Sequence, residues 1–312
     1  KWYDSVSIDR HGPLPRSMTG ARYFTSFHTN TGVVNVVCHR QPSDLLTVFK
    51  YVRTLLGTPR HIRMDRAPYL LSHAADATGS YTAFHRYVID SGIAFTTSAP
   101  GHQEENGRAE RSGARTIYEH ATSVLFDAGL PAPWWPHAVV WLGHVETCLA
   151  KERLEWKAGF ENHYGIQPYI GCWRRFGSPC FIHKTKDARG PGAAFVSRVD
   201  RGVWLGEDVD FSKPGTFRVF DLETERLRTV KDVWVDEDFR FVTKTPTGWR
   251  FHEARLNADY DLMDRLSADD LPSVPAPLGS VPAPSGSAQT VPAPSGSDPT
   301  APAPAGPGQP GP

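Results

Sequence analysis

The sequence predicts a mixed α/β domain, followed by a small antiparallel β-barrel and by a tail that cannot form a core. Residues 3–128 alternate between β-rich runs and helical spacing in the order β-β-β-α-β-α-β-α, which describes a mixed sheet flanked by helices. From about residue 172, short β-like runs recur between Gly, Pro and charged turns, as in a small barrel. Residues 274–297 repeat Val-Pro-Ala-Pro-x-Gly-Ser, which is typical of an extended, disordered segment.

The first three strands are expected to form a meander. Residues 3–9 alternate between apolar and polar side chains and end at Asp9. Residues 21–27 and 32–38 are rich in β-branched and aromatic types, and the turn between them has hairpin chemistry.

A helix is expected at 43–57, with Ser43 as its N-cap and Gly57 as its stop. The remaining elements of the expected five-stranded sheet are a strand that ends at Asp65, a helix at 82–91 and a strand at 92–97.

A long helix is expected at 106–128. At 100° per residue, Glu110 falls on the same apolar stripe as Ile117, Ala121 and Ala128. A carboxylate on the buried side of a helix is costly unless it is paired or bound to a metal. A second helix, at 133–151, is rich in Trp, Val and Leu and is expected to pack against the first.

Three acidic residues lie where this scaffold could bring carboxylates together: Asp9, Asp65 and Glu110. An aspartate at the end of a strand is more often a turn former, so neither aspartate alone indicates a site. Three carboxylates together can hold two divalent cations, and two metals can drive phosphodiester chemistry. The pattern therefore points to an enzyme that cuts and joins nucleic acid strands.

The net charge of the chain does not indicate nucleic-acid binding, because Lys+Arg and Asp+Glu number 34 each. Residues 172–201 are locally basic, with seven Lys/Arg against two Asp, and are compatible with a phosphate backbone or with an ordinary solvated loop. The same two interpretations apply to Arg108, Arg111 and Arg115, which share one face of the predicted helix.

The four cysteines form no Cys-x-x-Cys pair, which argues against a zinc module and fits core thiols in an intracellular protein. No apolar run is as long as a membrane span, so no membrane partner is expected. The chain begins with Lys1 rather than Met, as expected of a fragment or processed product of a larger polyprotein.

Several ordered motifs resemble the integrase of copia-type retrotransposons, in the retroviral integrase superfamily of ribonuclease H-like fold. The resemblance covers roughly residues 3 to 239. The stretches that carry it are Ile8-Asp9-Arg10-His11-Gly12-Pro13, Ile62-Arg63-Met64-Asp65, Glu105-Asn106-Gly107-Arg108-Ala109-Glu110-Arg111, Leu130-Pro131-Ala132-Pro133-Trp134-Trp135 and Gly202-Val203-Trp204-Leu205-Gly206. No single motif is decisive, but their order and spacing together are fairly specific.

The resemblance implies that Asp9, Asp65 and Glu110 are catalytic and bind two Mg²⁺ or Mn²⁺ ions, without a small-molecule cofactor. It implies that the protein carries out DNA 3′-processing and strand transfer, with the element ends and target DNA as partners. It also implies that the protein forms homo-oligomers and is nuclear when it acts on chromosomal DNA. The expected DNA-binding residues are Arg66, Asn106, Arg108, Arg111, Arg115, Arg174, Arg175, Lys184 and Lys186.

Some residues depart from the family pattern. Between Asp65 and Glu110 there are 44 residues, more than the family usually has, Arg66 follows Asp65 directly, and Glu104 and Glu105 add negative charge before Asn106. An alternative is therefore a catalytically inactive or domesticated remnant that binds nucleic acid or serves in assembly. A third interpretation is a nuclease of the same fold without joining activity.

Five segments are expected along the chain. They are a catalytic core at 1–155, a connector at 156–171, the β-barrel at 172–240, a polar linker at 241–270 and the disordered tail at 271–312.

Overall fold

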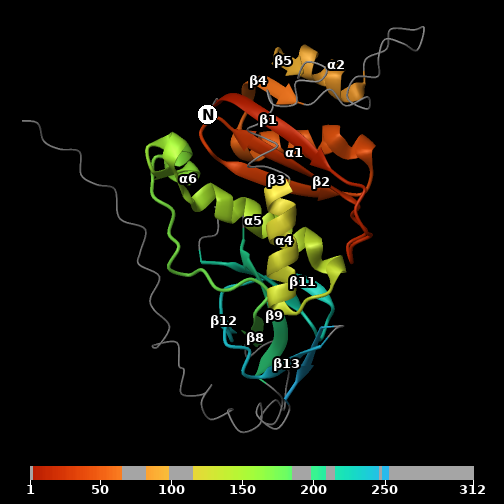
Figure 1. The fold of residues 1–312 in the computed structure, drawn as a ribbon, viewed down its shortest axis with the longest axis vertical. Helices are drawn as coiled ribbons and strands as arrows, with labels where there is room; N and C mark the ends of the chain where they lie inside the picture. Colours follow the sequence, from red (N-terminus) through yellow and green to blue (C-terminus); the bar gives the residue numbers. More distant parts are fainter. Residues whose placement is uncertain are drawn as a thin grey trace, which may run out of the picture. The chain divides into compact units, whose positions relative to one another are not determined.

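The computed structural model describes residues 3–64, 82–97, 115–184, 198–208, 215–245 and 248–252 (Figure 1). The described residues contain two five-stranded sheets and two two-stranded ones, with helices packed on the first sheet.

The first sheet is mixed and has the strand order β3-β2-β1-β4-β5. Its strands are β1 (Tyr3–His11), β2 (Tyr23–Thr29), β3 (Val34–His39), β4 (Pro59–Met64) and β5 (Ala94–Thr97). β1, β2 and β3 pair antiparallel as the expected meander, and β4 pairs parallel with both β1 and β5. The predicted mixed five-stranded sheet is thus confirmed. β1 continues two residues past Asp9, because its pairing with β2 extends to His11 opposite Phe24.

Helices α1 (Leu45–Leu56) and α2 (Ala83–Asp90) share one core with the sheet. Val48, Phe49 and Val52 of α1 pack in it with Val6 and Ile8 of β1. The prediction of the α2 helix is confirmed, and Thr82 caps it by accepting the His85 N–H at 3.1 Å.

Ser43 is not the N-cap of α1, contrary to expectation. It lies inside a 3-10 turn, η1 (Pro42–Asp44), which precedes the helix. The Asp44 carboxylate accepts the backbone N–H groups of Arg40 and Gln41, and this capping arrangement starts the helical chain before Ser43. Gly57 ends α1 as predicted, with a φ of 95° that favours glycine.

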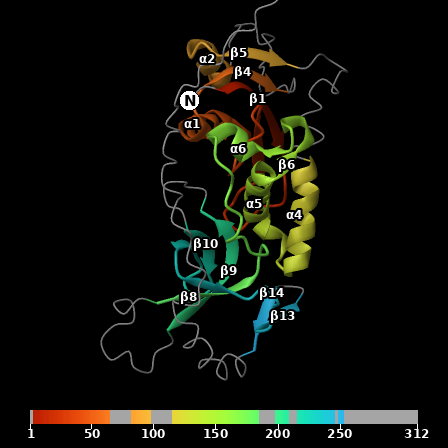
Figure 2. The same ribbon diagram turned by 90° about the vertical axis from the view of Figure 1, so that its left-hand side faces the viewer.

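Helices α4 (Arg115–Ala128) and α5 (Trp135–Cys148) pack against each other (Figure 2). Ile117, Ala121 and Ala128 are buried, as the predicted apolar stripe of α4 requires. They share a core with Phe24 of β2 and with Val34 and Val36 of β3. Residues 106–114 of the expected helix, including Glu110, lie outside the described residues. Among helices that are described, none is long and apolar enough to span a bilayer.

One hydroxyl of α5 reaches the edge of the first sheet. Thr147 Oγ1 accepts the backbone N–H of Val34 at 2.8 Å and lies 3.0 Å from the Val34 carbonyl oxygen. Thr147 is buried, and its hydroxyl also lies 2.9 Å from the Gly143 carbonyl.

A short segment follows α5. It contains η5 (Glu152–Leu154), the two-residue pair β6 (Ala150–Lys151) and β7 (Lys157–Ala158), and α6 (Gly159–Tyr164). Gly159, at the start of α6, lies against the β2–β3 turn at Gly32.

The second sheet is antiparallel throughout and has the order β11-β10-β9-β8-β12. Its strands are β8 (Pro179–His183), β9 (Val199–Glu207), β10 (Phe217–Asp221), β11 (Arg226–Val230) and β12 (Val233–Val235). The expected antiparallel unit is present, but in the part of the chain that the structure describes its edge strands β11 and β12 do not pair to close a barrel. The β-like run at 228–235 is two strands on opposite edges, because the chain turns at Lys231 and Asp232.

The two sheets share a core. Phe176, Val203 and Leu205 are buried in the same cluster as Ile117 of α4 and Trp135 of α5. The second sheet also has a cluster of its own, formed by Cys180, Ile182, Trp204 and Val219, so it shares only part of its core with the first sheet.

Part of the expected polar linker at 241–270 is ordered structure. β13 (Val242–Thr245) and β14 (Gly248–Phe251) form an antiparallel hairpin. Phe241 is buried against Phe181, and the Trp249 indole donates a hydrogen bond to the Ala128 carbonyl at 2.9 Å. These aromatic anchors explain why a segment that looks polar overall packs on the folded unit.

Candidate functional site

Strand β1 presents a polar face opposite the core of α1 and α2. Val6 and Ile8 are buried in that core, so strand alternation places Ser5, Ser7 and Asp9 on the other face. Asp9 is half-buried and is paired in register with Ser26 of β2, whose hydroxyl reaches the Asp9 carbonyl at 3.5 Å. The central strands thus bring polar groups together around the predicted site residue.

Strand β4 runs parallel to β1 and in register with it. Ser7 lies opposite Arg63, and Ile8 lies opposite Met64. Ile62 and Met64 are buried in the same core as Val6 and Ile8. Met64 is the last residue of β4, and Asp65, which follows it in sequence, lies outside the described residues.

The end of β1 is in contact with the first turn of α4. The His11 ring lies 5.0 Å from the ring of Tyr118 and 5.3 Å from that of Phe24, measured between centroids. Burial among these rings lowers the pKa of His11, so its imidazole is held neutral at physiological pH. The contact fixes the N-terminal turn of α4 beside the end of β1 that carries Asp9.

Of the three acidic residues of the predicted metal site, the structure describes only Asp9. The other predicted site residues outside the described ranges are Asp65, Arg66, Asn106, Arg108, Glu110, Arg111 and Lys186, and the side chain of Arg115 at the start of α4 is not described either. Within the described ranges no three His, Cys, Asp or Glu side chains gather as a metal site would require. The carboxylate triad therefore stays a prediction.

Three predicted DNA-binding residues, Arg174, Arg175 and Lys184, have carboxylate partners within the protein. Arg175 forms a two-pronged ion pair with Asp127, at 2.7 Å between Nε and Oδ2. Arg174 lies 3.9 Å from a carboxylate oxygen of Glu237, and Lys184 lies 2.6 Å from one of Asp200. A phosphate would have to compete with these carboxylates, and DNA binding by the three residues stays a prediction.

The expected core position is confirmed for Cys180, whereas Cys38, Cys148 and Cys172 are half-buried. Cys180 is fully buried, and burial raises the pKa values of both Cys38 and Cys180 far above the ordinary thiol range. Burial also raises the pKa of Cys172 to about 12, and its thiol donates a hydrogen bond to Glu207. Thiols held protonated in this way are poor nucleophiles and poor metal ligands.

A small cavity of about 60 Å³ opens on the polar face of β1, beside Ser5 and Ser7. His28 lines it and is 9% exposed, and its Nε2 has no hydrogen-bond partner among the residues that the structure describes. Burial, with smaller contributions from Lys151 and Arg153, lowers the pKa of His28 to about 3. His28 is therefore a neutral imidazole at pH 7.

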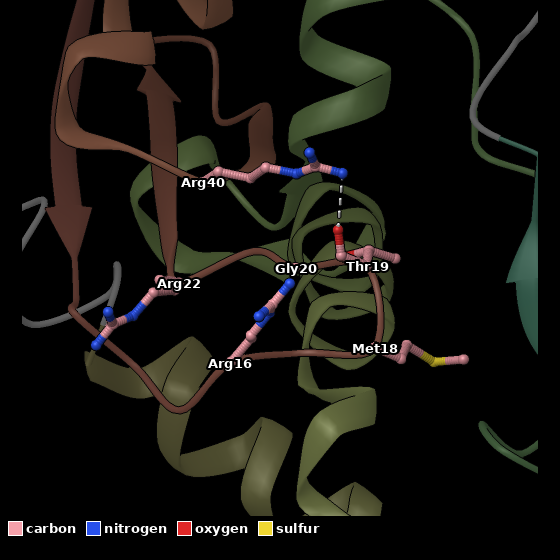
Figure 3. A pocket seen from close by; sticks show the side chains of 6 residues that line it. All are labelled: Arg16, Met18, Thr19, Gly20, Arg22 and Arg40. Carbon is pink, nitrogen blue, oxygen red and sulfur yellow. Dashed lines mark hydrogen bonds between the residues drawn. The ribbon is translucent and has the colours of Figure 1, made fainter.

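A larger pocket of about 490 Å³ lies at the β1–β2 connection (Figure 3). Arg16 and Arg22 come from this connection, and Arg40 follows β3. Sequence reasoning missed this cluster, because Arg40 lies beyond β2 and β3 in sequence and is brought to Arg16 and Arg22 only by the folding of the meander. The predicted β1–β2–β3 meander was the one signal that could have located them.

The comparisons with known proteins find relatives among transposon polyproteins. No family model matches the chain. The chain is 27% identical over 171 residues to the "Retrovirus-related Pol polyprotein from transposon RE1" of Arabidopsis thaliana, a match that covers 53% of this chain and 11% of the relative. It is 31% identical over 140 residues to the "Retrovirus-related Pol polyprotein from transposon TNT 1-94" of Nicotiana tabacum, covering 44% of this chain and 10% of the relative.

Among solved structures, the chain is similar to the HTLV-2 integrase catalytic core domain in complex with magnesium. That likeness has a TM-score of 0.36 and 18% identity, and it covers 51% of this chain and 95% of the other. The chain spans about a tenth of the length of the curated relatives that it matches. Part of the chain is therefore similar in sequence to part of the retrovirus-related transposon Pol polyproteins, and the described part folds as a mixed five-stranded sheet with helices packed on it.

Proposed function

We propose that the chain is the core of a transposon integrase that processes DNA 3′ ends and joins them to target DNA. The observation that carries the proposal is the pairing of Ile8 with Met64 in parallel strands. Asp9 directly follows Ile8 in sequence, and Asp65 directly follows Met64. Because consecutive Cα atoms are about 3.8 Å apart, the chain cannot carry Asp65 far from the end of β4.

Glu110 is the third acidic residue of the proposed site. It precedes Arg115, the first residue of α4, by five residues, which span at most about 18 Å even when fully extended. The first turn of α4 contacts His11, two residues beyond Asp9. The chain between Arg115 and Glu110 is therefore short enough to return to the end of β1.

The donor chemistry fits two Mg²⁺ or Mn²⁺ ions. Hard divalent cations prefer oxygen ligands, and the three proposed residues supply carboxylates only. When bound, such a metal pair activates a water or a DNA 3′-hydroxyl and stabilises the leaving oxygen. The role of Asp9, Asp65 and Glu110 is to hold and orient the ions, while DNA and further copies of the chain are the proposed partners.

Metal binding and strand transfer test the proposal together. Asp9→Asn, Asp65→Asn and Glu110→Gln should each lose Mn²⁺ binding by calorimetry and lose Mn²⁺-dependent strand transfer on a labelled DNA end. Asp4→Asn is a matched control on the same strand, because Asp4 is exposed and lies 3.7 Å from Arg60. It should behave as the wild type.

Two outcomes would contradict the enzyme proposal. A wild-type chain that binds DNA but neither binds Mn²⁺ nor joins strands would be an inactive remnant that binds nucleic acid or serves in assembly. A chain that cuts DNA with Mn²⁺ but never joins it would be a nuclease of the same fold. Product analysis on a sequencing gel separates cutting from joining.

A further inference from the structure

The pocket at the β1–β2 connection is lined by three arginines, of which Arg22 extends away from the other two (Figure 3). Arg16, Arg22 and Arg40 line it together with Met18, Thr19 and Gly20 (Figure 3). All three arginines are exposed. Sequence reasoning assigned no role to any of them.

The backbone that carries these arginines is held in place. The Arg22 N–H donates to the His39 carbonyl at 3.1 Å, which ties the connection to the end of β3. The Met18 N–H donates to the Pro133 carbonyl at 3.1 Å, and the Trp135 indole donates to the Pro15 carbonyl at 2.9 Å. The arginines therefore project from an anchored loop rather than from a free one.

Two of the arginines converge on the tip of this loop. Arg40 donates through Nη2 to the Thr19 carbonyl at 3.3 Å, and Arg16 points toward Gly20 (Figure 3). Gly20 has a φ of 81°, and a Cβ added there would lie 3.4 Å from Arg40 Nε. The loop thus leaves the Arg40 side chain room to lie across its tip.

No carboxylate in the described part of the chain forms an ion pair with these three guanidinium groups. Asp44 is the acidic residue nearest in sequence to Arg40, but its Oδ2 accepts the backbone N–H groups of Arg40 and Gln41. By contrast, Arg174, Arg175 and Lys184 each have a carboxylate partner. Three like charges without a carboxylate partner favour an anionic ligand.

We propose that Arg16, Arg22 and Arg40 bind the phosphate backbone of duplex DNA. The guanidinium group matches phosphate oxygens in a two-pronged geometry, and contacts of this kind position DNA without reading its sequence. The surface is open, and its arginines come from two chain segments. Such a surface can contact several successive phosphates better than it can enclose one small ion.

The arginine pocket lies close to the proposed active site. This inference rests on the proposed function. Arg22 directly precedes β2, and Ser26 of the same strand is paired with Asp9. At about 3.3 Å per residue, the four steps from Arg22 to Ser26 span about 13 Å. DNA that reaches Asp9 along this direction would pass over the arginine pocket.

Salt-dependent DNA binding by the full chain tests the surface. Fluorescence anisotropy with a labelled duplex of random sequence gives the affinity between 50 and 200 mM NaCl. Each of Arg16→Gln, Arg22→Gln and Arg40→Gln should weaken binding and lower the slope of log K against log salt by about 0.9. The triple variant should lower it by about 2.7. Arg60→Gln is the control with the same charge change, since Arg60 is exposed and pairs with Asp4.

The proposal fails if the triple variant keeps the wild-type affinity and slope while its circular dichroism melt is unchanged. It also fails if the wild type does not bind duplex DNA, or if the variants lose affinity for duplex RNA only. Asp65→Asn separates this inference from the enzyme proposal. That variant should bind DNA with the wild-type slope whether or not the wild type joins strands, while the triple arginine variant should keep its Mn²⁺ affinity.

Discussion

Arg175 and Asp127 join the chain that enters the second sheet to the last turn of α4 by a two-pronged ion pair. Their side chains are 41% and 53% exposed, so water and salt screen the attraction. Arg175 also lies over the ring of Phe239, with 4.9 Å between the guanidinium carbon and the ring centroid. A residue expected to bind DNA thus has a structural role within the protein.

A double-mutant cycle should measure this ion pair. Arg175→Ala and Asp127→Ala should show a coupling of at most about 1 kcal/mol in urea denaturation, because exposed pairs contribute little. The hydrogen bond from Arg175 lowers the pKa of Asp127, so the coupling should be present at neutral pH and be lost as Asp127 is protonated in acid. It should also vanish in 1 M NaCl, and a coupling that is unchanged there would contradict an electrostatic origin.

The buried imidazole of His28 predicts a loss of stability in mild acid. Burial holds its pKa near 3 in the folded protein, whereas the unfolded chain binds a proton near pH 6.5. The stabilisation is therefore complete above pH 6.5 and is lost as the pH falls toward 3. Between pH 6.5 and 5 the loss should be about 2 kcal/mol.

Urea denaturation at pH 7, 6 and 5 measures this effect. His28→Gln should show a shallower fall of unfolding free energy with pH than the wild type. The remaining slope should include His137, whose pKa burial lowers to about 4. Parallel curves for the two proteins would show that His28 is protonated without cost in the folded state.

The shared core predicts that the two sheets unfold together. Phe176 is buried in one cluster with Ile117 of α4 and Val203 of β9. Phe176→Ala should lower the unfolding free energy by about 3–5 kcal/mol, since it removes a fully buried aromatic side chain. Tryptophan fluorescence and far-ultraviolet circular dichroism should report one common transition in both proteins. Two separate transitions in the wild type would mean that the sheets fold independently.

A close backbone contact predicts that Gly159 tolerates no side chain. A Cβ at Gly159 would lie 2.2 Å from the Gly32 carbonyl oxygen, so the β2–β3 turn and α6 would have to move apart. Gly159→Ala should cost about 1–3 kcal/mol by thermal or urea denaturation. Gly165→Ala is the matched control, because it has open space and only a positive φ of 77° to overcome. A Gly159→Ala variant as stable as the wild type would contradict the close contact, because Gly159 has no positive φ that could add backbone strain.

The regular part of the fold could be predicted from local patterns. The strand alternation before Asp9, the β-branched run at 32–38 and the glycine stop at Gly57 are each set by neighbouring residues, and each matches the structure. The starting point of α1 could not be predicted in this way, because two backbone N–H groups bind Asp44 and shift the cap away from Ser43.

Features that depend on distant contacts were missed. The hairpin β13–β14 is anchored by Trp249 to the carbonyl of Ala128, a contact 121 residues apart in sequence. The shared core and the three arginines of the pocket likewise come from separate chain segments. Of the proposed metal site, the structure describes only Asp9, on the polar face of β1, and all three acidic residues stay a prediction from the sequence.

The Thr147 hydroxyl has a consequence for self-association. β3 is an edge strand of the first sheet, and exposed edge strands can pair with strands of other molecules. At Val34 the backbone N–H already donates to the Thr147 hydroxyl, so an incoming strand finds no free donor there. One side chain from α5 thus removes one of the hydrogen-bond donors that a neighbouring strand would need to extend the sheet at this edge.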